Sequence, residues 1–105
     1  MRKVMLLCNA GMSSSLMAKK ATEYMKEIQK DIYVEATTTA SASDVFENPD
    51  YEMILISPQV RMLYDEYSQK ANEYGKKIAQ LSFDAYSPTS IGVKKMADII
   101  LTELD

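Results

Sequence analysis

Short apolar runs alternate with longer segments of mixed character along this chain. Residues 4–7 and 53–56 are continuous apolar runs, as expected of strands that are covered on both faces of a parallel sheet. Residues 32–37 alternate apolar and polar positions and predict an edge strand, and residues 78–83 predict a further strand. The pattern therefore predicts a sheet whose best-covered strands are those at 4–7 and 53–56.

The segments between these runs carry apolar residues at helical spacing. The first follows Ser13–Ser15, whose hydroxyls suit an N-cap, and its apolar face continues to a predicted end near Lys30. A short helix is predicted over residues 40–47, and a longer one over residues 60–74, with the glycine that follows as its stop. The last helix is expected to start near Ser87-Pro88, because proline suits the first helical position.

This alternation predicts an α/β fold with a three-layer open sheet of four parallel strands in the order 2-1-3-4 and helices on both faces. We expect residues 1–105 to form a single domain. Ligands of such sheets bind beyond the carboxyl ends of the strands, at the point where the strand order reverses. With this order, the loops at residues 8–15 and 57–59 meet at that point.

Charge and hydropathy narrow the range of partners. The chain has 12 Lys and Arg against 15 Asp and Glu, and its basic residues are spread out, so we expect no nucleic-acid partner. No run of about 18 apolar residues could span a bilayer, and the first apolar run is too short for a signal peptide. We therefore expect a cytoplasmic protein without direct membrane insertion.

Cys8 is the single cysteine, and the chain has no histidine. One cysteine cannot close an intramolecular disulfide, and a Cys-His dyad and the usual zinc sites both need histidine or further cysteines. We therefore expect no metal and no bound cofactor. Any chemistry at Cys8 must be activated by the backbone and by charge.

The loop after Cys8 is rich in small residues, which allows several backbone N–H groups to turn inward around a tetrahedral anion. The predicted phosphoryl-binding residues are Asn9, Ala10, Gly11, Met12, Ser13, Ser14 and Ser15. Unpaired amides at a helix N-terminus favour a thiolate, and they also stabilise a phosphoryl group in flight. We predict that Cys8 is a phosphoryl-accepting nucleophile; the alternative is a small buried apolar residue at the end of a strand.

Other chemistries on this kind of sheet fit less well. A low-molecular-weight phosphatase needs an arginine six residues after its cysteine, where this chain has Ser14. A thioredoxin needs a second cysteine. A response-regulator receiver needs an aspartate at the end of its third strand, where this chain has Ile56-Ser57. Phosphoryl transfer to and from Cys8 is the chemistry that these residues leave open.

Three segments resemble one known family. Residues 7–16, LCNAGMSSSL, resemble the Cys-x-Ala-Gly-Met-Ser-x-Ser-Leu stretch of enzyme IIB in the lactose/cellobiose/chitobiose branch of the bacterial phosphoenolpyruvate-dependent sugar phosphotransferase system. Residues 54–60, ILISPQV, resemble the family's apolar strand followed by Gly/Ser-Pro-Gln. Asp84-Ala85-Tyr86 and Gly92-Val93 resemble its last loop and helix.

The resemblance implies that Cys8 accepts a phosphoryl group from a phosphohistidine of enzyme IIA. It then passes the group to a β-linked disaccharide, such as cellobiose, chitobiose or lactose, during transport by the membrane component IIC. We expect a monomer between its partners. Ser57, Gln59 and Arg61 could contact the phosphoryl group or a partner; the alternatives are ordinary turn chemistry for Ser57 and Gln59 and a solvated surface position for Arg61. A degenerate phosphatase and a regulatory anion-binding module remain as alternative functions.

Overall fold

The computed structural model describes residues 2–9 and 11–104, in which four parallel strands form one sheet. The strands are β1 (Arg2–Cys8), β2 (Ile32–Thr38), β3 (Tyr51–Ile56) and β4 (Lys77–Gln80). Their order is β2-β1-β3-β4, so the predicted topology and the edge position of β2 are confirmed. β4 ends at Gln80, earlier than predicted, because its only partner β3 ends at the paired residue Ile56.

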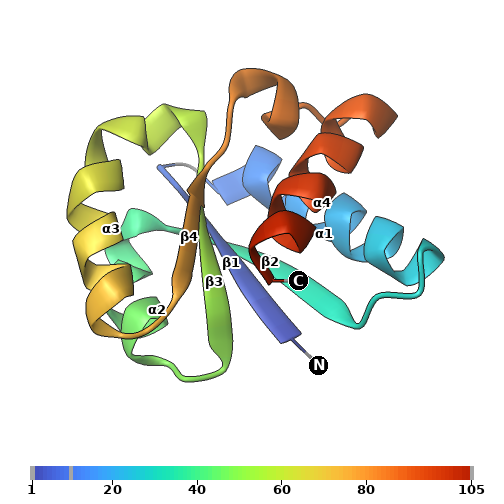
Figure 1. The fold of residues 1–105 in the computed structure, drawn as a ribbon. Helices are drawn as coiled ribbons and strands as arrows, with labels where there is room; N and C mark the ends of the chain where they lie inside the picture. Colours follow the sequence, from blue (N-terminus) through green and yellow to red (C-terminus); the bar gives the residue numbers. More distant parts are fainter. Residues whose placement is uncertain (1, 10, 105) are drawn as a thin grey trace.

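Helices cover both faces of the sheet, as the α/β pattern predicted (Figure 1). They are α1 (Gly11–Glu27), α2 (Ala42–Glu47), α3 (Tyr64–Glu73) and α4 (Ser90–Leu104). Three short 3₁₀ segments join them to the strands: η1 (Thr39–Ser41), η2 (Pro58–Leu63) and η3 (Phe83–Tyr86). α1 and α4 lie side by side on one face, and α2 and α3 lie on the other.

Successive residues of the central strand β1 serve two different cores. Val4 and Leu6 pack into the core under α1 and α4, whereas Met5 and Leu7 pack into the core under α2 and α3. The alternation follows from the strand's period of two. It also assigns the next residue, Cys8, to the α1/α4 face.

The boundaries of α1 differ from the sequence prediction at both ends. The helix begins at Gly11, so Ser13–Ser15 lie in its first turns instead of capping it. It ends at Glu27, before the predicted Lys30, because Gln29 adopts a left-handed conformation with φ 60°. The Lys30 N–H then bonds the Met25 carbonyl at 2.8 Å, which closes the helix end.

The starts of α3 and α4 also lie later than predicted. Val60 has a non-helical φ of −121°, so a 3₁₀ segment precedes α3 and the α-helix starts only at Tyr64. α4 starts at Ser90, two residues after Pro88, because Thr89 supplies the cap: its Oγ1 accepts a hydrogen bond from the Gly92 N–H at 3.1 Å. The predicted stop at Gly75 is confirmed by its φ of 70°.

Two helix ends with positive φ make a matched pair for testing this description. Gln29→Gly should raise the free energy of unfolding by roughly 0.5–1 kcal/mol, because glycine adopts the left-handed conformation without steric cost. Gly75→Ala should lower it by about 1 kcal/mol through strain alone, since no atom lies within 4 Å of the added methyl. Urea denaturation measures both, and shifts of the same sign would contradict the assigned backbone conformations.

Candidate functional site

Cys8 is the last residue of β1, at the carboxyl end of the central strand, and its side chain is fully buried and not part of a disulfide. β2 and β3 flank it: Cys8 pairs with Thr38, and the Ser57 N–H bonds the Leu7 carbonyl at 3.1 Å. The backbone of α1 begins at Gly11, directly after this strand end. The thiol therefore lies where the strand order reverses and a helix N-terminus begins, as the sequence predicted.

The buried Ser14 side chain contacts the thiol. Its Oγ donates a hydrogen bond to the Cys8 Sγ and lies 2.9 Å from the Tyr86 hydroxyl oxygen. Because a serine hydroxyl has one proton and Ser14 gives it to sulfur, Tyr86 must donate to Ser14. A hydrogen-bond chain thus runs from Tyr86 in η3 through Ser14 in α1 to Cys8 in β1. We call these three side chains the thiol chain.

Ser14 reaches the thiol because it continues the buried face of α1. The face runs along the helix as Ser14, Met17, Ala18, Ala21 and Met25. These positions are spaced i, i+3, i+4, i+7 and i+11, the spacing of one helical face. A serine that takes an apolar position on such a face must find a polar partner. This spacing is the sequence signal that sets Ser14 apart from the N-cap hydroxyls among which it was predicted.

Tyr86 is held by the close approach of η3 to α4. A Cβ atom on Gly92 would lie 2.2 Å from the Ser87 carbonyl oxygen, so only glycine permits the backbone beside Tyr86 to pack so closely. The exposed ion pair of Lys95 with Asp84 ties the same turn to α4. The hydrogen bond from Lys95, with a second from Ser82, lowers the pKa of Asp84 to about 2. These contacts place the Tyr86 hydroxyl over the start of α1.

The remaining predicted loop residues divide into two groups. Asn9 and Ser15 are exposed. Ala10 and the side chains of Gly11, Met12 and Ser13 lie outside the part of the chain that is described. The prediction that these residues bind a phosphoryl group therefore stays a prediction.

The second loop contributes one buried side chain, Ser57, whose exposed fraction is 0%. Gln59 and Arg61 are exposed, and the Arg61 guanidinium donates to the Pro58 carbonyl at 3.0 Å. Within residues 2–9 and 11–104, neither side chain forms a hydrogen bond with the loop that follows Cys8. Ser57 is thus the residue of this loop that the fold brings next to the end of β1.

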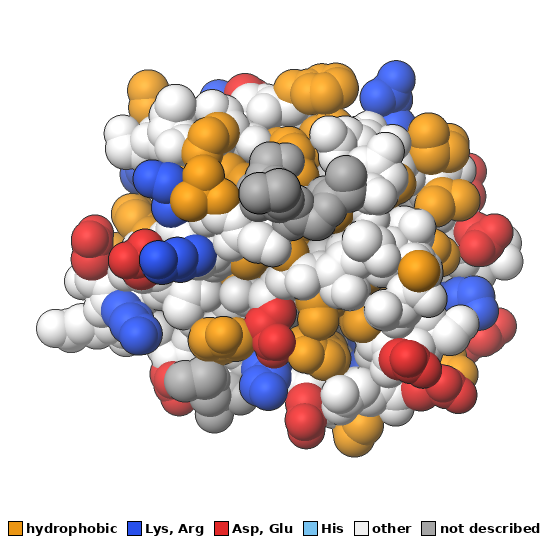
Figure 2. Space-filling model, turned by 180° about the vertical axis from the view of Figure 1, so that it is seen from behind, with side chains coloured by type: hydrophobic (Ala, Val, Ile, Leu, Met, Phe, Trp, Pro, Cys, Tyr) orange, Lys and Arg blue, Asp and Glu red, His pale blue; other side chains and the backbone are white. Residues whose placement is uncertain are grey.

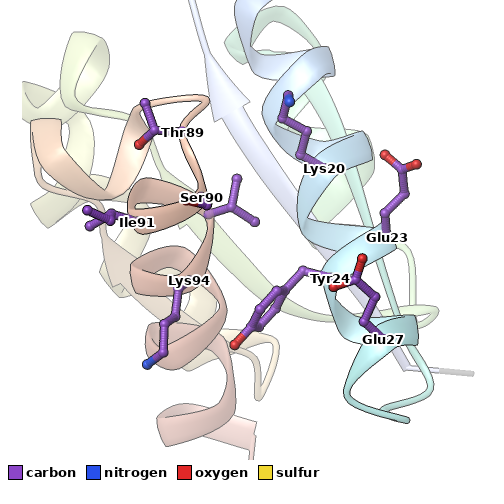
Figure 3. Close-up of a pocket in the computed structure, with 9 residues that line it drawn as sticks. Lys20, Glu23, Tyr24, Glu27, Thr89, Ser90, Ile91 and Lys94 are labelled. Atoms are coloured by element: carbon purple, nitrogen blue, oxygen red, sulfur yellow. The ribbon is translucent and has the colours of Figure 1, made fainter.

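A groove of about 530 Å³ lies between α1 and α4 (Figure 3). Lys20, Glu23, Tyr24 and Glu27 line it from α1, and Thr89, Ser90, Ile91 and Lys94 line it from α4. None of the three thiol-chain residues lines this groove. This groove is therefore separate from the thiol chain.

The charge on the surface is mixed. Acidic and basic side chains are interspersed on the face in Figure 2, with no broad field of one sign. Among the described residues there is no group of three His, Cys, Asp or Glu that could hold a metal ion. No helix within that part of the chain is both long and apolar enough to cross a membrane.

Three sequence relatives carry related names. The oligo-beta-mannoside-specific EIIB component of Bacillus subtilis is 30% identical over 86 residues, covering 82% of each chain. The galactose-specific EIIB component of Lactococcus lactis is 29% identical over 86 residues, covering 79% of this chain and 80% of the relative. The lactose-specific EIICB component of Staphylococcus haemolyticus is 29% identical over 77 residues, which are 73% of this chain but 13% of that longer protein.

Two solved structures share the fold. The lactose-specific IIB domain from Streptococcus pneumoniae superposes with a TM-score of 0.85 at 21% identity, covering 99% of this chain and 98% of its own. The cellobiose-specific IIB component from Borrelia burgdorferi gives a TM-score of 0.71 at 21% identity, covering 96% and 89%. Both confirm the predicted architecture.

The family model described as the lactose/cellobiose-specific IIB subunit of the PTS system matches residues 3–100 of this chain. Together with the relative that is 30% identical, this match confirms the family that the three sequence segments indicated. The chain belongs to the lactose/cellobiose-specific IIB family of the sugar phosphotransferase system and is a sugar phosphotransferase component of that type.

Proposed function

We propose that Cys8 carries a phosphoryl group from a phosphohistidine of an enzyme IIA to a β-linked disaccharide that a membrane component IIC transports. The observation that carries this proposal is the thiol chain: a hydrogen bond from Ser14, backed by Tyr86, reaches the one sulfur that stands before a helix N-terminus. Such donors stabilise negative charge on sulfur. They act without histidine, of which the chain has none.

The chemistry balances in two steps. In the first, the Cys8 sulfur forms a bond to phosphorus as the histidine N–P bond breaks, and the thiol proton goes to the histidine nitrogen. In the second, a sugar hydroxyl oxygen bonds to phosphorus, the S–P bond breaks, and the hydroxyl proton leaves to solvent. Sulfur carries developing negative charge in both steps, first as nucleophile and then as leaving group, so one donor at Ser14 serves both.

The absence of an arginine at position 14 suits a carrier better than a hydrolase. A guanidinium would clamp the phosphoryl oxygens with a bidentate, charged contact. Ser14 instead offers one neutral hydroxyl, and that hydroxyl is already engaged with sulfur. The phosphoryl group is then held loosely enough to be passed on, which favours transfer over the degenerate-phosphatase alternative.

Exposed apolar side chains around the carboxyl end of the sheet support docking of a partner protein. They are Leu16 in α1, Met62 in η2, Phe83 in η3 and Ile91 in α4, with exposed fractions from 45% to 72%. Exposed clusters of this kind often mark protein contacts. Since Cys8 has no exposed surface, docking of the donor must also uncover the sulfur.

The partners and location complete the proposal. The EIICB relative joins B and C components by name in one protein, which supports a membrane component IIC as the acceptor side for this chain. We place the transfer in the cytoplasm, where a free thiol stays reduced, and expect a monomer between partners.

Labelling tests the central step. Incubation with labelled phosphoenolpyruvate, the general components and an enzyme IIA should label the wild-type chain, and Cys8→Ser should abolish the label while leaving the circular-dichroism spectrum unchanged. A label that survives in Cys8→Ser would exclude Cys8 as the carrier. Rapid release of inorganic phosphate by the wild type would instead support the phosphatase alternative.

The thiol chain can be tested by single substitutions. Ser14→Ala removes the hydrogen bond to the Cys8 sulfur, a loss of about 0.5–1.5 kcal/mol, so the rate of phosphoryl transfer from a phosphorylated enzyme IIA to Cys8 should fall about twofold to tenfold. Tyr86→Phe should lower this rate by a smaller factor, because it acts through Ser14.

Gly92→Ala tests whether the position of Tyr86 matters for the thiol chain. Its methyl must displace Ser87 and with it Tyr86, so its rate of phosphoryl transfer from enzyme IIA should fall as that of Tyr86→Phe does, and the two changes together should add little. Gly75→Ala is the control, because it costs stability at a site whose added methyl meets no neighbouring atom. Equal transfer rates for Gly92→Ala and Gly75→Ala would show that Gly92 acts only through stability.

A further inference from the structure

Ser57 is an exception among the buried polar side chains. Ser14, Thr22 and Ser57 are the buried polar side chains in the described part of the chain. Ser14 bonds Cys8 and Tyr86, and Thr22 exchanges hydrogen bonds with the Val34 backbone at 2.9 and 3.1 Å. The Ser57 Oγ has no hydrogen-bond partner among the described residues. A buried hydroxyl without a partner costs stability, so its presence calls for a physical reason.

The strand register places Ser57 beside Cys8. The pairs Leu6–Leu55 and Leu7–Ile56 match residue for residue, and the Ser57 N–H continues the ladder by bonding the Leu7 carbonyl. Leu6 and Leu55 face α1 and α4, whereas Leu7 and Ile56 face the other core. Because Ser57 is still extended, with φ −69° and ψ 157°, alternation puts it on the α1/α4 face together with Cys8.

The turn itself does not need this hydroxyl. Ser57 precedes η2, yet its side chain makes no cap hydrogen bond. The backbone is held by other groups: the Val60 N–H bonds the Ser57 carbonyl at 3.2 Å, and the Gln80 side chain donates to the Ile56 carbonyl at 3.1 Å. Alanine would satisfy the same backbone contacts. Ordinary turn chemistry, the alternative weighed from the sequence, therefore does not explain a serine here.

We propose that the Ser57 hydroxyl binds the phosphoryl group on Cys8, donating a hydrogen bond to one of its oxygens. The inference rests on the proposed function, and it makes Ser57 a catalytic residue supplied by the second loop. Neighbouring strands lie about 4.8 Å apart, and a phosphoryl oxygen extends two bonds beyond sulfur, so a rotating hydroxyl on the next strand can reach it. The hydroxyl gains its partner only when Cys8 is phosphorylated.

Ser57→Ala should therefore preserve or raise the stability of the unphosphorylated protein but weaken its hold on the phosphoryl group. The unphosphorylated variant should be at least as stable as the wild type, with an equal or higher urea midpoint, because an unpaired buried hydroxyl is gone. The phosphorylated variant loses a donor, so its phosphoryl-transfer equilibrium with a phosphorylated enzyme IIA should shift about tenfold toward the IIA protein. Phosphate-affinity gels at a series of protein ratios measure that equilibrium.

Thr22→Val is the matched control, since Thr22 is also a buried hydroxyl but is fully partnered and lies away from Cys8. It should lower the urea midpoint and leave the transfer equilibrium unchanged. Ser57→Gly should repeat the tenfold shift. An unchanged equilibrium in both Ser57→Ala and Ser57→Gly would overturn the role of Ser57. Absence of label from the wild type would instead reject the proposed function itself.

Discussion

The structure depends on how a fully buried sulfur is accommodated at the end of a central strand. A thiol in that position could remain an inert apolar residue. Ser14 instead draws it into a polar network by donating a hydrogen bond to the sulfur from the first turns of α1. The Ser14 hydroxyl is in turn hydrogen-bonded to Tyr86. The consecutive elements β1 and α1 and the distant η3 are thus linked by one hydrogen-bond chain.

The parallel sheet sets where these elements can meet. Order β2-β1-β3-β4 places the carboxyl end of β1 between β2 and β3, with α1 leaving directly above it. β3 ends at Ile56 because Pro58 cannot continue the ladder, and the chain then turns through Ser57 beside the thiol. η3 reaches the same region only because Gly92 lets α4 approach the Ser87 backbone. The site is therefore a product of strand order and one close helix contact.

The fold could be predicted from the sequence because its signals are local. Continuous apolar runs indicate the two central strands. Gly75, just after α3, indicates a helix end with the left-handed backbone conformation that glycine favours. The helix starts were less predictable, since Thr89 and Pro88 both suit a start and only the actual hydrogen bond to Gly92 decides between them. Cys8 was found from its place after a strand and before small residues. Tyr86 was quoted as part of a motif but could not be assigned to the thiol, because its partner Ser14 lies 72 positions earlier in the chain.

The central claim is that phosphorus is bonded to the Cys8 sulfur during transfer, and a ³¹P NMR spectrum of the phosphorylated chain tests it most directly. The account predicts one resonance of an S-phosphorylated thiol, which disappears on oxidation by iodine. It also predicts that phosphoryl transfer to a fresh, unphosphorylated enzyme IIA removes the resonance. A phosphoramidate or phosphate-ester resonance in its place, or an S-phosphoryl resonance that cannot be discharged to enzyme IIA, would contradict it.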